Sequence, residues 1–413
     1  MSKRQTTSRR RGKGSITSYR TKSGTKWRFQ VWVPADPEFP DGEWKHVGKG
    51  GFETADAADD AMQDARRHQK AGVDLTATVP TVAAYSKRWL DSLDLSAAAM
   101  AQYRRNMTKH VVPHIGDMRL DKVTATRIGK LYVDLQRPDS RRTRAVGGLS
   151  KNTVKKVATN LSQMFDAAVE DRYIAVNPTK RKAAKAPTAT AVKRQQKEMV
   201  TWSPSQLSAF LAWDRDTFND DSHALWFIAA HTGMRRSELL ALRWADIDLA
   251  AGRIQVRRAL DTARPGEVKG TKSNQARSVD IDPGSVAVLR QWRTSRAALS
   301  FELARADAWV FGTLAGALRC PVSTSEMFGR RVAKARKALG SDALPVLTLH
   351  GLRHTHATIL LEAGVNPKVV SERLGHASVA FTLTVYGHVT PTMQRGAVDR
   401  FAAALAMASN GTD

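Results

Sequence analysis

Two stretches of this chain carry many positive charges and no acid, and they divide it into segments that can fold separately. Residues 1–30 contain ten Lys or Arg and no Asp or Glu, and residues 179–197 contain seven and again no acid. The second stretch shows no apolar periodicity, so it cannot close a hydrophobic core by itself. The pattern predicts a basic disordered arm over residues 1–14 and a basic, extended interdomain linker over 179–200, with folded regions on either side of that linker.

The overall charge indicates a polyanionic partner. The 413 residues include 65 Lys and Arg against 39 Asp and Glu, which gives a formal net charge of +26. A basic excess of this size is typical of proteins that bind nucleic acid.

The composition also excludes several classes of protein. Cys320 is the single cysteine, so neither a disulfide framework nor a cysteine-based zinc site is expected. No apolar run approaches the roughly 18 residues of a membrane span, and no apolar segment follows the basic N-terminus as in a secretory signal. The sequence therefore predicts a soluble, cytoplasmic protein of several domains.

Residues 15–72 predict a small β-meander followed by one helix. Apolar side chains at every second position of residues 27–33 have the period of a strand. Asp41-Gly42 signals a turn, and residues 43–47 are the candidate returning strand. Thr54 is a candidate N-cap for an Ala- and acid-rich helix that follows.

Residues 78–178 predict a domain of about four helices. Apolar residues at 82, 85 and 89 share one helical face, and those at 100, 103, 107 and 111 share another that runs up to Pro113. Thr124 and Ser150 are candidate N-caps for two further helices.

Residues 201–413 predict a mostly helical domain with short strands. Residues 253–258 and 277–281 alternate apolar and polar side chains, so each predicts a strand, and a hairpin-like excursion joins them. Residues 394–407 predict an amphipathic helix. The fold class predicted for the whole chain is mainly α with small β-sheets, in several domains.

Four segments of this last domain contain residues that could take part in chemistry. They are Thr232-Gly233-Met234-Arg235-Arg236-Ser237-Glu238, Gly270-Thr271-Lys272, His350-Gly351-Leu352-Arg353, and Gly375-His376 with Tyr386 ten residues further on. Glu238 lies three residues after Arg235 on a candidate helix, so its carboxylate could orient the guanidinium. His350 and Arg353 have the same spacing and would project from one helical face.

Each segment alone has an ordinary structural explanation. A surface ion pair, a solvated loop lysine, a buried histidine and a half-buried tyrosine are all commoner than catalytic groups. These explanations do not account for the order Arg, Lys, His-x-x-Arg, Gly-His and Tyr within one basic domain.

The histidines at 350, 354 and 356 raise a metal-binding alternative. His350 and His354 have the spacing of a zinc-binding helix, but Gly351 stands where a metalloprotease carries its glutamate, and the sequence offers no evident third ligand. We therefore expect neither a metal nor a cofactor, and we interpret His354 and His356 as packing or hydrogen-bonding groups.

The ordered motifs resemble those of the tyrosine recombinases, specifically the phage-type integrases. The resemblance covers the chain from about Trp202 to the C-terminus, where four spaced motifs agree. Residues 78–178 resemble the core-binding domain of that family, a helical domain of the SAM-like type. Residues 15–72 resemble, by pattern alone, the small arm-type DNA-binding domain that some integrases carry.

The resemblance implies a role for each motif residue. Arg235 and Arg353 would hold the scissile phosphate, with Glu238 supporting Arg235 from behind. Tyr386 would be the nucleophile that forms a 3′-phosphotyrosyl intermediate, and His350 would accept its proton or be its hydrogen-bond partner in that step. Lys272 would be the general acid, and His376 would donate a hydrogen bond to the phosphate.

Two neighbouring residues compete with these assignments. Arg236 follows Arg235, and the Thr-Gly-x-Arg register favours Arg235. Lys269 lies three residues before Lys272; strand alternation puts the two on opposite faces, and the five-residue spacing to Arg277 favours Lys272.

The resemblance also implies an activity and partners. The chain would cut and rejoin DNA without metal or ATP, for integration or excision of a phage or other mobile element, in association with the nucleoid of a bacterial host. Its partners would be double-stranded DNA at core and arm sites, three further copies of itself in a tetramer on DNA, and accessory bending or directionality factors. Candidate DNA-binding residues are Arg9, Arg10, Arg11, Arg28, Lys180, Arg181 and Lys182.

Other functions remain open from the residues alone. A topoisomerase or resolvase would use the same nucleophile, a DNA-binding regulator could keep the fold without the chemistry, and a basic nucleic-acid chaperone would need only the charge. The first differs from an integrase in its products, and the other two predict no covalent adduct with DNA.

Overall fold

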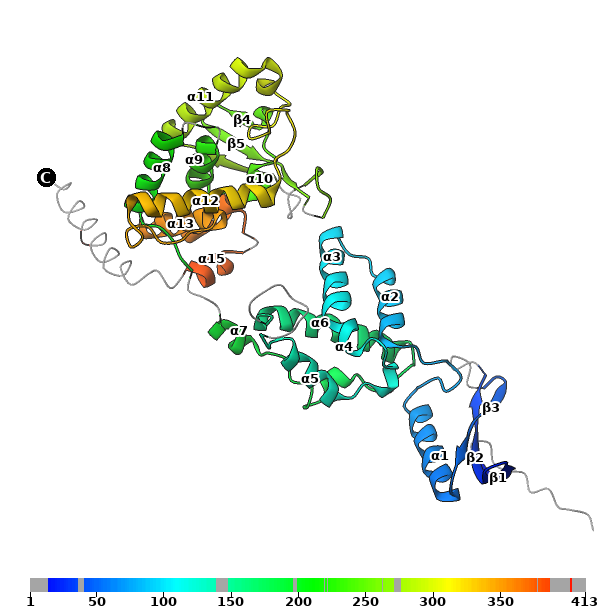
Figure 1. Ribbon diagram of the computed structural model, residues 1–413. Helices are drawn as coiled ribbons and strands as arrows, with labels where there is room; N and C mark the ends of the chain where they lie inside the picture. Colours follow the sequence, from blue (N-terminus) through cyan, green and yellow to red (C-terminus); the bar gives the residue numbers. More distant parts are fainter. Residues whose placement is uncertain are drawn as a thin grey trace, which may run out of the picture. The chain divides into compact units, whose positions relative to one another are not determined.

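The structure is a computed structural model that describes residues 14–35, 41–138, 148–195, 199–218, 220, 222–261, 263–270, 276–376, 378–386 and 402. The chain divides into two units, Met1–Lys197 and Glu198–Asp413, which are described separately below. Figure 1 shows the elements of both in chain order.

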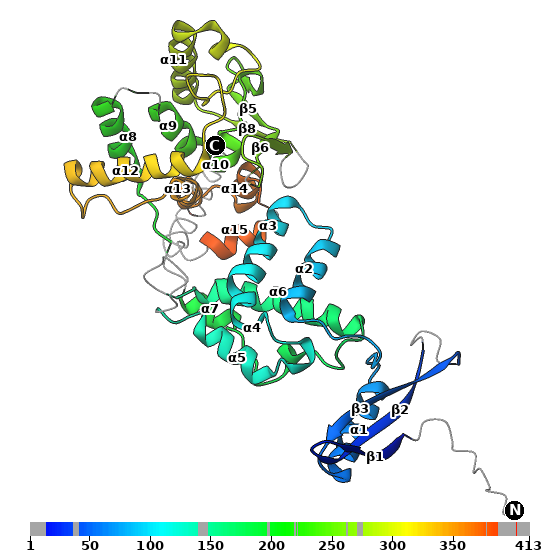
Figure 2. The ribbon, with the colours of Figure 1, turned by 45° about the vertical axis from the view of Figure 1, so that its right-hand side comes forward.

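The N-terminal unit begins with an antiparallel meander of β1 (Ser15–Thr21), β2 (Gly24–Pro34) and β3 (Trp44–Phe52). Phe29, Val31 and Val33 of β2 are buried and cluster with Met62 of α1 (Ala55–Lys70), which lies along one face of the sheet (Figure 2). The Thr54 hydroxyl accepts a hydrogen bond from the backbone N–H of Ala57, as an N-cap does. The predicted meander and helix are therefore confirmed.

Helices form the rest of this unit. They are α2 (Val82–Ser92), α3 (Ala97–Arg105), α4 (Val112–Ile115), α5 (Ala125–Asp134) and α6 (Lys151–Glu170), with a short 3₁₀ turn at Leu120–Lys122. Their apolar faces share one hydrophobic cluster. Thr124 and Ser150 cap α5 and α6 through their hydroxyls, as predicted.

The helical face that runs up to Pro113 continues through that residue. A π-helical stretch, Asn106–Val111, joins α3 to α4, so the three segments form one path. Pro113 lacks an N–H and would crowd a regular α-helical turn; the wider π turn just before it shifts the hydrogen bonding and removes that conflict. The chain thus stays helical past a residue that usually ends a helix.

The basic segment after residue 178 is not extended throughout, which corrects the prediction of an extended linker over 179–200. It contains a 3₁₀ turn, Pro178–Lys180, and the helix α7 (Ala189–Gln195). Ala184 is buried in the helical cluster, and Lys180 Nζ lies 2.6 Å from Asp166 Oδ1. Small alanine side chains and one ion pair thus hold this part of the segment against the helices.

The C-terminal unit contains most of the remaining helices. They are α8 (Pro204–Phe218), α9 (Ser222–Thr232), α10 (Arg236–Leu239), α11 (Pro283–Leu299), α12 (Pro321–Leu339), α13 (Leu349–Glu362), α14 (Pro367–Leu374) and α15 (Val379–Tyr386). Two 3₁₀ turns lie at Trp244–Asp246 and Phe301–Ala304. Helix α9 is buried along most of its length and packs against α8, α11 and α13, as a helix that is apolar on all sides must.

Short strands lie beside these helices. β4 (Ile247–Asp248), β5 (Arg253–Val256) and β8 (Arg277–Asp280) form an antiparallel sheet, and β6 (Arg258–Leu260) pairs with β7 (Val268–Gly270) as the hairpin between β5 and β8. The predicted strands and the excursion are confirmed. The fold class, mainly α with small sheets, is confirmed as well. Of the predicted helix over 394–407, the structure describes only Ala402, so this prediction is not tested.

Candidate functional site

The candidate site begins at the turn that follows α9. Gly233 has φ +61°, and a Cβ there would lie 2.7 Å from both His356 Cδ2 and Leu374 Cδ2. Only glycine fits this turn, because any side chain would separate α13 and α14 from it. Two residues later, Arg235 stands at the start of α10.

Arg235 is held by Glu238, as the spacing predicts. Its Nη1 donates to Glu238 Oε1 at 2.8 Å, and its backbone N–H donates to Glu238 Oε2 at 2.9 Å. Nη2 donates to the carbonyl of Gly375 at 2.6 Å. The side chain stays 39% exposed, so part of the guanidinium faces solvent.

Glu238 is buried and is shared with a second arginine. Arg277 at the start of β8 donates from Nη1 and Nη2 to the two carboxylate oxygens, at 2.9 and 2.6 Å. Burial opposes ionisation of this carboxyl, but the hydrogen bonds and charge of Arg277, and then the charge of Arg235, outweigh it and hold the pKa of Glu238 below its usual value. The carboxylate is therefore charged and fully engaged.

Arg353 is buried in the first half of α13. It donates from Nη1 to the carbonyl of Gly233 and from Nη2 to that of Leu374, each at 2.8 Å. Thr348 caps this helix, and His350 lies one turn before Arg353, as predicted. His350 is exposed where Arg353 is buried.

The end of α14 brings these arginines together. Gly375 closes the helix with φ +67°, a left-handed conformation that suits glycine. The carbonyls of Arg373, Leu374 and Gly375 accept from Arg277, Arg353 and Arg235, respectively. Carbonyls at a helix C-terminus lack intrahelical partners and carry partial negative charge, so they attract cations.

His376 follows this helix end directly. Its Nδ1 lies 2.7 Å from the hydroxyl oxygen of Thr382 on α15, and its ring meets that of Phe381 edge-on at 4.9 Å. Burial first, and then the charges of Arg353 and Arg235, lower the pKa of His376 to about 4. The ring is neutral at neutral pH.

The histidines of α13 are also kept neutral. Partial burial, and then the charges of Arg353 and Arg235, lower the pKa of His350. Burial, and then His350 and Arg353, lower the pKa of His354 to about 4; the rings of His350 and His354 meet edge-on at 4.7 Å.

His356 is a buried hydrogen-bonding group, as expected. Its Nδ1 lies 2.9 Å from the carbonyl of Ala230, and its Nε2 accepts from Arg373 Nε at 3.0 Å. Nδ1 therefore carries the proton. Burial, and then Arg373, lower the pKa of His356 to about 3.

The structure thus brings together Arg235, Glu238, Arg353 and His376 around one helix end. Tyr386 is the last residue of α15, one turn after Thr382, and only its place in the helix is described. Lys272 lies outside the described residues. Its alternative Lys269 is on β7 and forms an ion pair with Asp261 at 3.0 Å.

The other alternative, Arg236, points to a different element. Its Nη1 donates to the hydroxyl of Ser325 on α12. This supports the choice of Arg235, which alone of the two reaches Glu238 and Gly375 among the hydrogen bonds of the described chain.

The candidate DNA-binding residues have different surroundings. Arg9, Arg10 and Arg11 lie outside the described residues. Arg28 is exposed on the face of β2 opposite α1 and donates to the Thr17 hydroxyl at 3.0 Å. Arg181 and Lys182 are exposed, whereas Lys180 is held by Asp166.

Two arginines of the site were not found by sequence reasoning. Arg277 entered that reasoning only as a spacing marker, and Arg373 not at all. The sequence signal for Arg277 is its position at the start of a strand, five residues after Lys272. Nothing in the sequence pairs it with Glu238, because 39 residues separate them.

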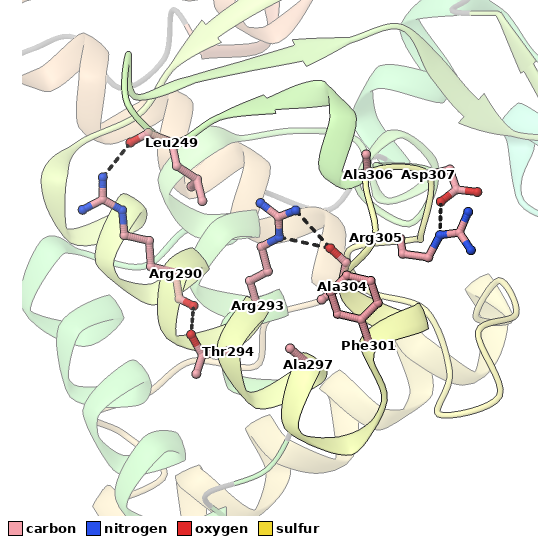
Figure 3. A pocket seen from close by; sticks show the side chains of 10 residues that line it. All are labelled: Leu249, Arg290, Arg293, Thr294, Ala297, Phe301, Ala304, Arg305, Ala306 and Asp307. Atoms are coloured by element: carbon pink, nitrogen blue, oxygen red, sulfur yellow. Dashed lines mark hydrogen bonds and ion pairs between the residues drawn. The ribbon is translucent and has the colours of Figure 1, made fainter.

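A pocket of about 850 Å³ lies elsewhere in the C-terminal unit, beside α11 (Figure 3). Its arginines are engaged locally: Arg290 donates to the carbonyl of Leu249, Arg293 to that of Ala304, and Arg305 pairs with Asp307. None of the predicted catalytic residues lines this pocket.

Within the described ranges, no three His, Cys, Asp or Glu side chains gather as metal ligands would. In that same part of the chain, no helix has both the length and the apolar character needed to cross a bilayer.

Comparison with known proteins finds a family model that matches each of the two units. A model of the phage integrase family matches residues 201–393, and a model of an arm DNA-binding domain matches residues 17–66. The ICEBs1 integrase of Bacillus subtilis is 29% identical over 306 residues, which cover 71% of this chain and 74% of that protein. The integrase of Mycobacterium phage D29 is 26% identical over 321 residues, 76% of this chain and 75% of that one.

Solved structures share the fold. The integrase of the Tn1549 transposon, in complex with a circular-intermediate DNA, has a TM-score of 0.65 at 22% identity, covering 78% of this chain and 99% of that one. A lambda integrase tetramer bound to a Holliday junction has a TM-score of 0.54 at 16% identity, covering 87% and 95%.

Proposed function

The chain belongs to the phage integrase family and is a tyrosine-type site-specific DNA recombinase; from this premise we propose how its own residues cut and rejoin DNA. The observation that carries the proposal is the cluster of Arg235 and Arg353 at the end of α14. Two guanidiniums at fixed positions can offset the negative charge of a phosphodiester, so that an oxyanion can attack its phosphorus.

The two arginines bind the non-bridging oxygens of the scissile phosphate. These oxygens repel a nucleophile, and two forked cations offset that charge and stabilise the pentacoordinate state. Arg235 contributes through its solvent-facing edge. Positioning and electrostatics thereby do the work that metal ions do in other phosphoryl-transfer enzymes.

Tyr386 is the nucleophile, and His350 accepts its proton. A phenol has an ordinary pKa of about 10, so it needs a base as it attacks phosphorus. The lowered pKa of His350 keeps its ring neutral and able to accept a proton. The P–O5′ bond breaks as the tyrosyl P–O bond forms, and Lys272 protonates the leaving 5′-oxygen.

His376 donates a hydrogen bond to the phosphate. When the Thr382 hydroxyl donates to Nδ1 of the neutral ring, the proton of that ring resides on Nε2, the nitrogen that would donate to the phosphate. The same hydrogen bond fixes the start of α15, whose last residue is Tyr386.

The phosphotyrosyl ester conserves the energy of the broken bond, so rejoining needs no ATP. Attack by the 5′-hydroxyl of a partner duplex gives recombination, and attack by the original hydroxyl restores the substrate. We propose a tetramer on two duplexes as the active assembly, with accessory DNA-bound factors setting direction, in the bacterial cytoplasm at the nucleoid.

The domains divide the DNA contacts. We propose that residues 15–72, with the basic arm 1–14, bind arm sites through Arg9, Arg10, Arg11 and Arg28. Residues 78–178 and the catalytic domain 201–413 bind the core site, and Lys180, Arg181 and Lys182 of the segment 179–200 contact the DNA backbone.

Trapping of the covalent intermediate tests this proposal. A nicked duplex that releases a short fragment after cleavage should give a denaturation-resistant protein–DNA complex with the native chain and none with Tyr386→Phe. Arg235→Lys should retain most DNA binding and lose cleavage by a factor on the order of 100 or more. Equal adduct in Tyr386→Phe would contradict the assignment of the nucleophile.

Two further measurements separate the alternatives. Cleavage should be the same with and without EDTA, because the arginines supply the positive charge. Joint molecules from two short recognition sites favour recombination, whereas relaxation of supercoils without sequence preference favours a topoisomerase.

A further inference from the structure

Arg277 is a partly buried arginine beside the candidate site that the proposed chemistry does not use. Its side chain is 14% exposed, against 39% for Arg235. Among the described residues its hydrogen bonds all go to the protein interior, two to the Glu238 carboxylate and one from Nε to the carbonyl of Arg373 at 3.0 Å. Arg277 therefore bonds Glu238, the carboxylate that holds Arg235, while Arg235 itself keeps an edge toward solvent.

The geometry of the carboxylate explains why a second arginine is needed. Glu238 Oε1 accepts from both Arg235 Nη1 and Arg277 Nη1, and Oε2 accepts from Arg277 Nη2 and the backbone N–H of Arg235. Without Arg277, two of these four donors are lost and the carboxylate can rotate to take Arg235 in a bidentate grip. That rotation would draw the guanidinium away from Gly375.

Arg277 also holds the helix end that Arg235 uses. The guanidinium lies close to Gly375, because a Cβ on that glycine would lie 2.9 Å from Arg277 Nη1. The arginine packs directly against Gly375 and bonds the carbonyl of Arg373. The Arg235 side chain is held by the Glu238 carboxylate and by the end of α14. Arg277 bonds both of these groups.

We infer that Arg277 is a positioning residue for activation of the phosphate: it fixes the Arg235 guanidinium through Glu238 and the end of α14 and makes no contact with DNA. This inference rests on the proposed role of Arg235. It predicts that loss of Arg277 impairs the chemical step and leaves DNA affinity nearly unchanged. A displacement of about 1 Å at a catalytic group costs on the order of 100-fold in rate.

A substrate with a neutral scissile group provides the test. Replacing one non-bridging oxygen by methyl removes the phosphate charge, so a cation is needed less. The cleavage rates of the native chain, Arg235→Ala and Arg277→Ala should be measured on phosphodiester and methylphosphonate duplexes. The rate loss in Arg277→Ala should be on the order of 100-fold on the phosphodiester and several-fold smaller on the methylphosphonate, in parallel with Arg235→Ala.

Arg253→Ala is the matched control. Arg253 lies in the same sheet and also pairs with a carboxylate, Asp280 at 2.6 Å, but it is half exposed and distant in the hydrogen-bond network from Glu238. It should cleave both substrates at the native rate. Arg277→Lys keeps the positive charge but cannot bind the carboxylate through two N–H groups of one guanidinium. Its cleavage rate on the phosphodiester should lie between those of the native chain and Arg277→Ala, and its rate loss should again be smaller on the methylphosphonate.

The outcomes are distinguishable. Arg277→Ala could lose the same factor in rate on both substrates while Arg235→Ala loses less on the methylphosphonate. That result would overturn the positioning role and leave the proposed function intact. No relief in Arg235→Ala would instead count against the proposed function. If Arg277→Ala does not fold, as judged by circular dichroism, the same comparison in Arg277→Lys decides, and native cleavage by that variant overturns the inference.

Discussion

Three histidines near the arginine pair are neutral for the same physical reason. Burial and nearby cations lower the pKa of His354 and His376 to about 4 and that of His356 to about 3. A histidine that binds its proton less tightly when folded favours unfolding as the pH falls, because the unfolded chain takes up the proton first.

The pH dependence of stability should reveal this for His356, the most buried of the three. The free energy of unfolding should be greatest above the ordinary histidine pKa of about 6.5 and should fall as the pH decreases from there toward about 3. This residue contributes at most about 1.4 kcal/mol per pH unit. Urea unfolding at several pH values measures how the free energy of unfolding depends on pH. The slope of this free energy against pH should be shallower for His356→Gln than for the native chain. The exposed His68→Gln should keep the native slope, and equal slopes in all three would contradict the prediction.

Gly375 offers a test of the helix end. Gly375→Ala introduces a left-handed alanine, which costs about 1 kcal/mol, and its Cβ would lie 2.9 Å from Arg277 Nη1. Thermal unfolding should show lower stability, and covalent-adduct assays should show slower cleavage. Gly316→Ala is the control: it also has a positive φ, but its Cβ would find only Leu303 at 3.7 Å. A cleavage defect of equal size in both variants would refute the argument.

Local signals predicted the helices well where one residue decides the outcome. Thr54, Thr124 and Ser150 each cap the helix expected of them, since a hydroxyl at that place satisfies a backbone N–H. The Arg235–Glu238 pair belongs to the same class, because three residues along a helix fix its geometry.

Features that depend on distant parts of the chain could not be predicted. The partnership of Arg277 and Glu238 needs β8 beside α10, and the burial of Ala184 needs the finished helical cluster. The helix through Pro113 depends on the π turn before it. Hydrophobic periodicity carries no information on such contacts.

The π-helical stretch can be tested through its buried amide pair. Asn106 Nδ2 donates to Asn160 Oδ1 at 2.6 Å, and both residues are 4% exposed. Asn106→Ala leaves Asn160 without this donor in the helical cluster and should destabilise the chain by about 1–3 kcal/mol in urea unfolding. Gln163→Ala, which removes an exposed hydrogen bond to Tyr103, should change stability by less than about 0.5 kcal/mol. Equal losses would contradict this account.

Affinity for DNA should follow the charge of the whole molecule. With a net charge of +26, the plot of log affinity against log salt concentration should be steep. Arg181→Ala and Lys182→Ala should each reduce its slope by about 0.9, if each residue meets one phosphate. Lys180→Ala should reduce it less, because Asp166 already neutralises that ammonium. Titrations at several salt concentrations measure this, and a larger effect for Lys180 would be the contrary result.

The end of α14 has a consequence for how the protein meets its substrate. Three consecutive peptide oxygens each hold a guanidinium, so the mutual repulsion of these cations is offset before any nucleic acid arrives. The positions of the cations are thus set by the backbone at the end of α14 rather than by an incoming anion. We therefore propose that this helix end is a preformed binding site for the scissile phosphate, which the DNA occupies without rearranging the arginines.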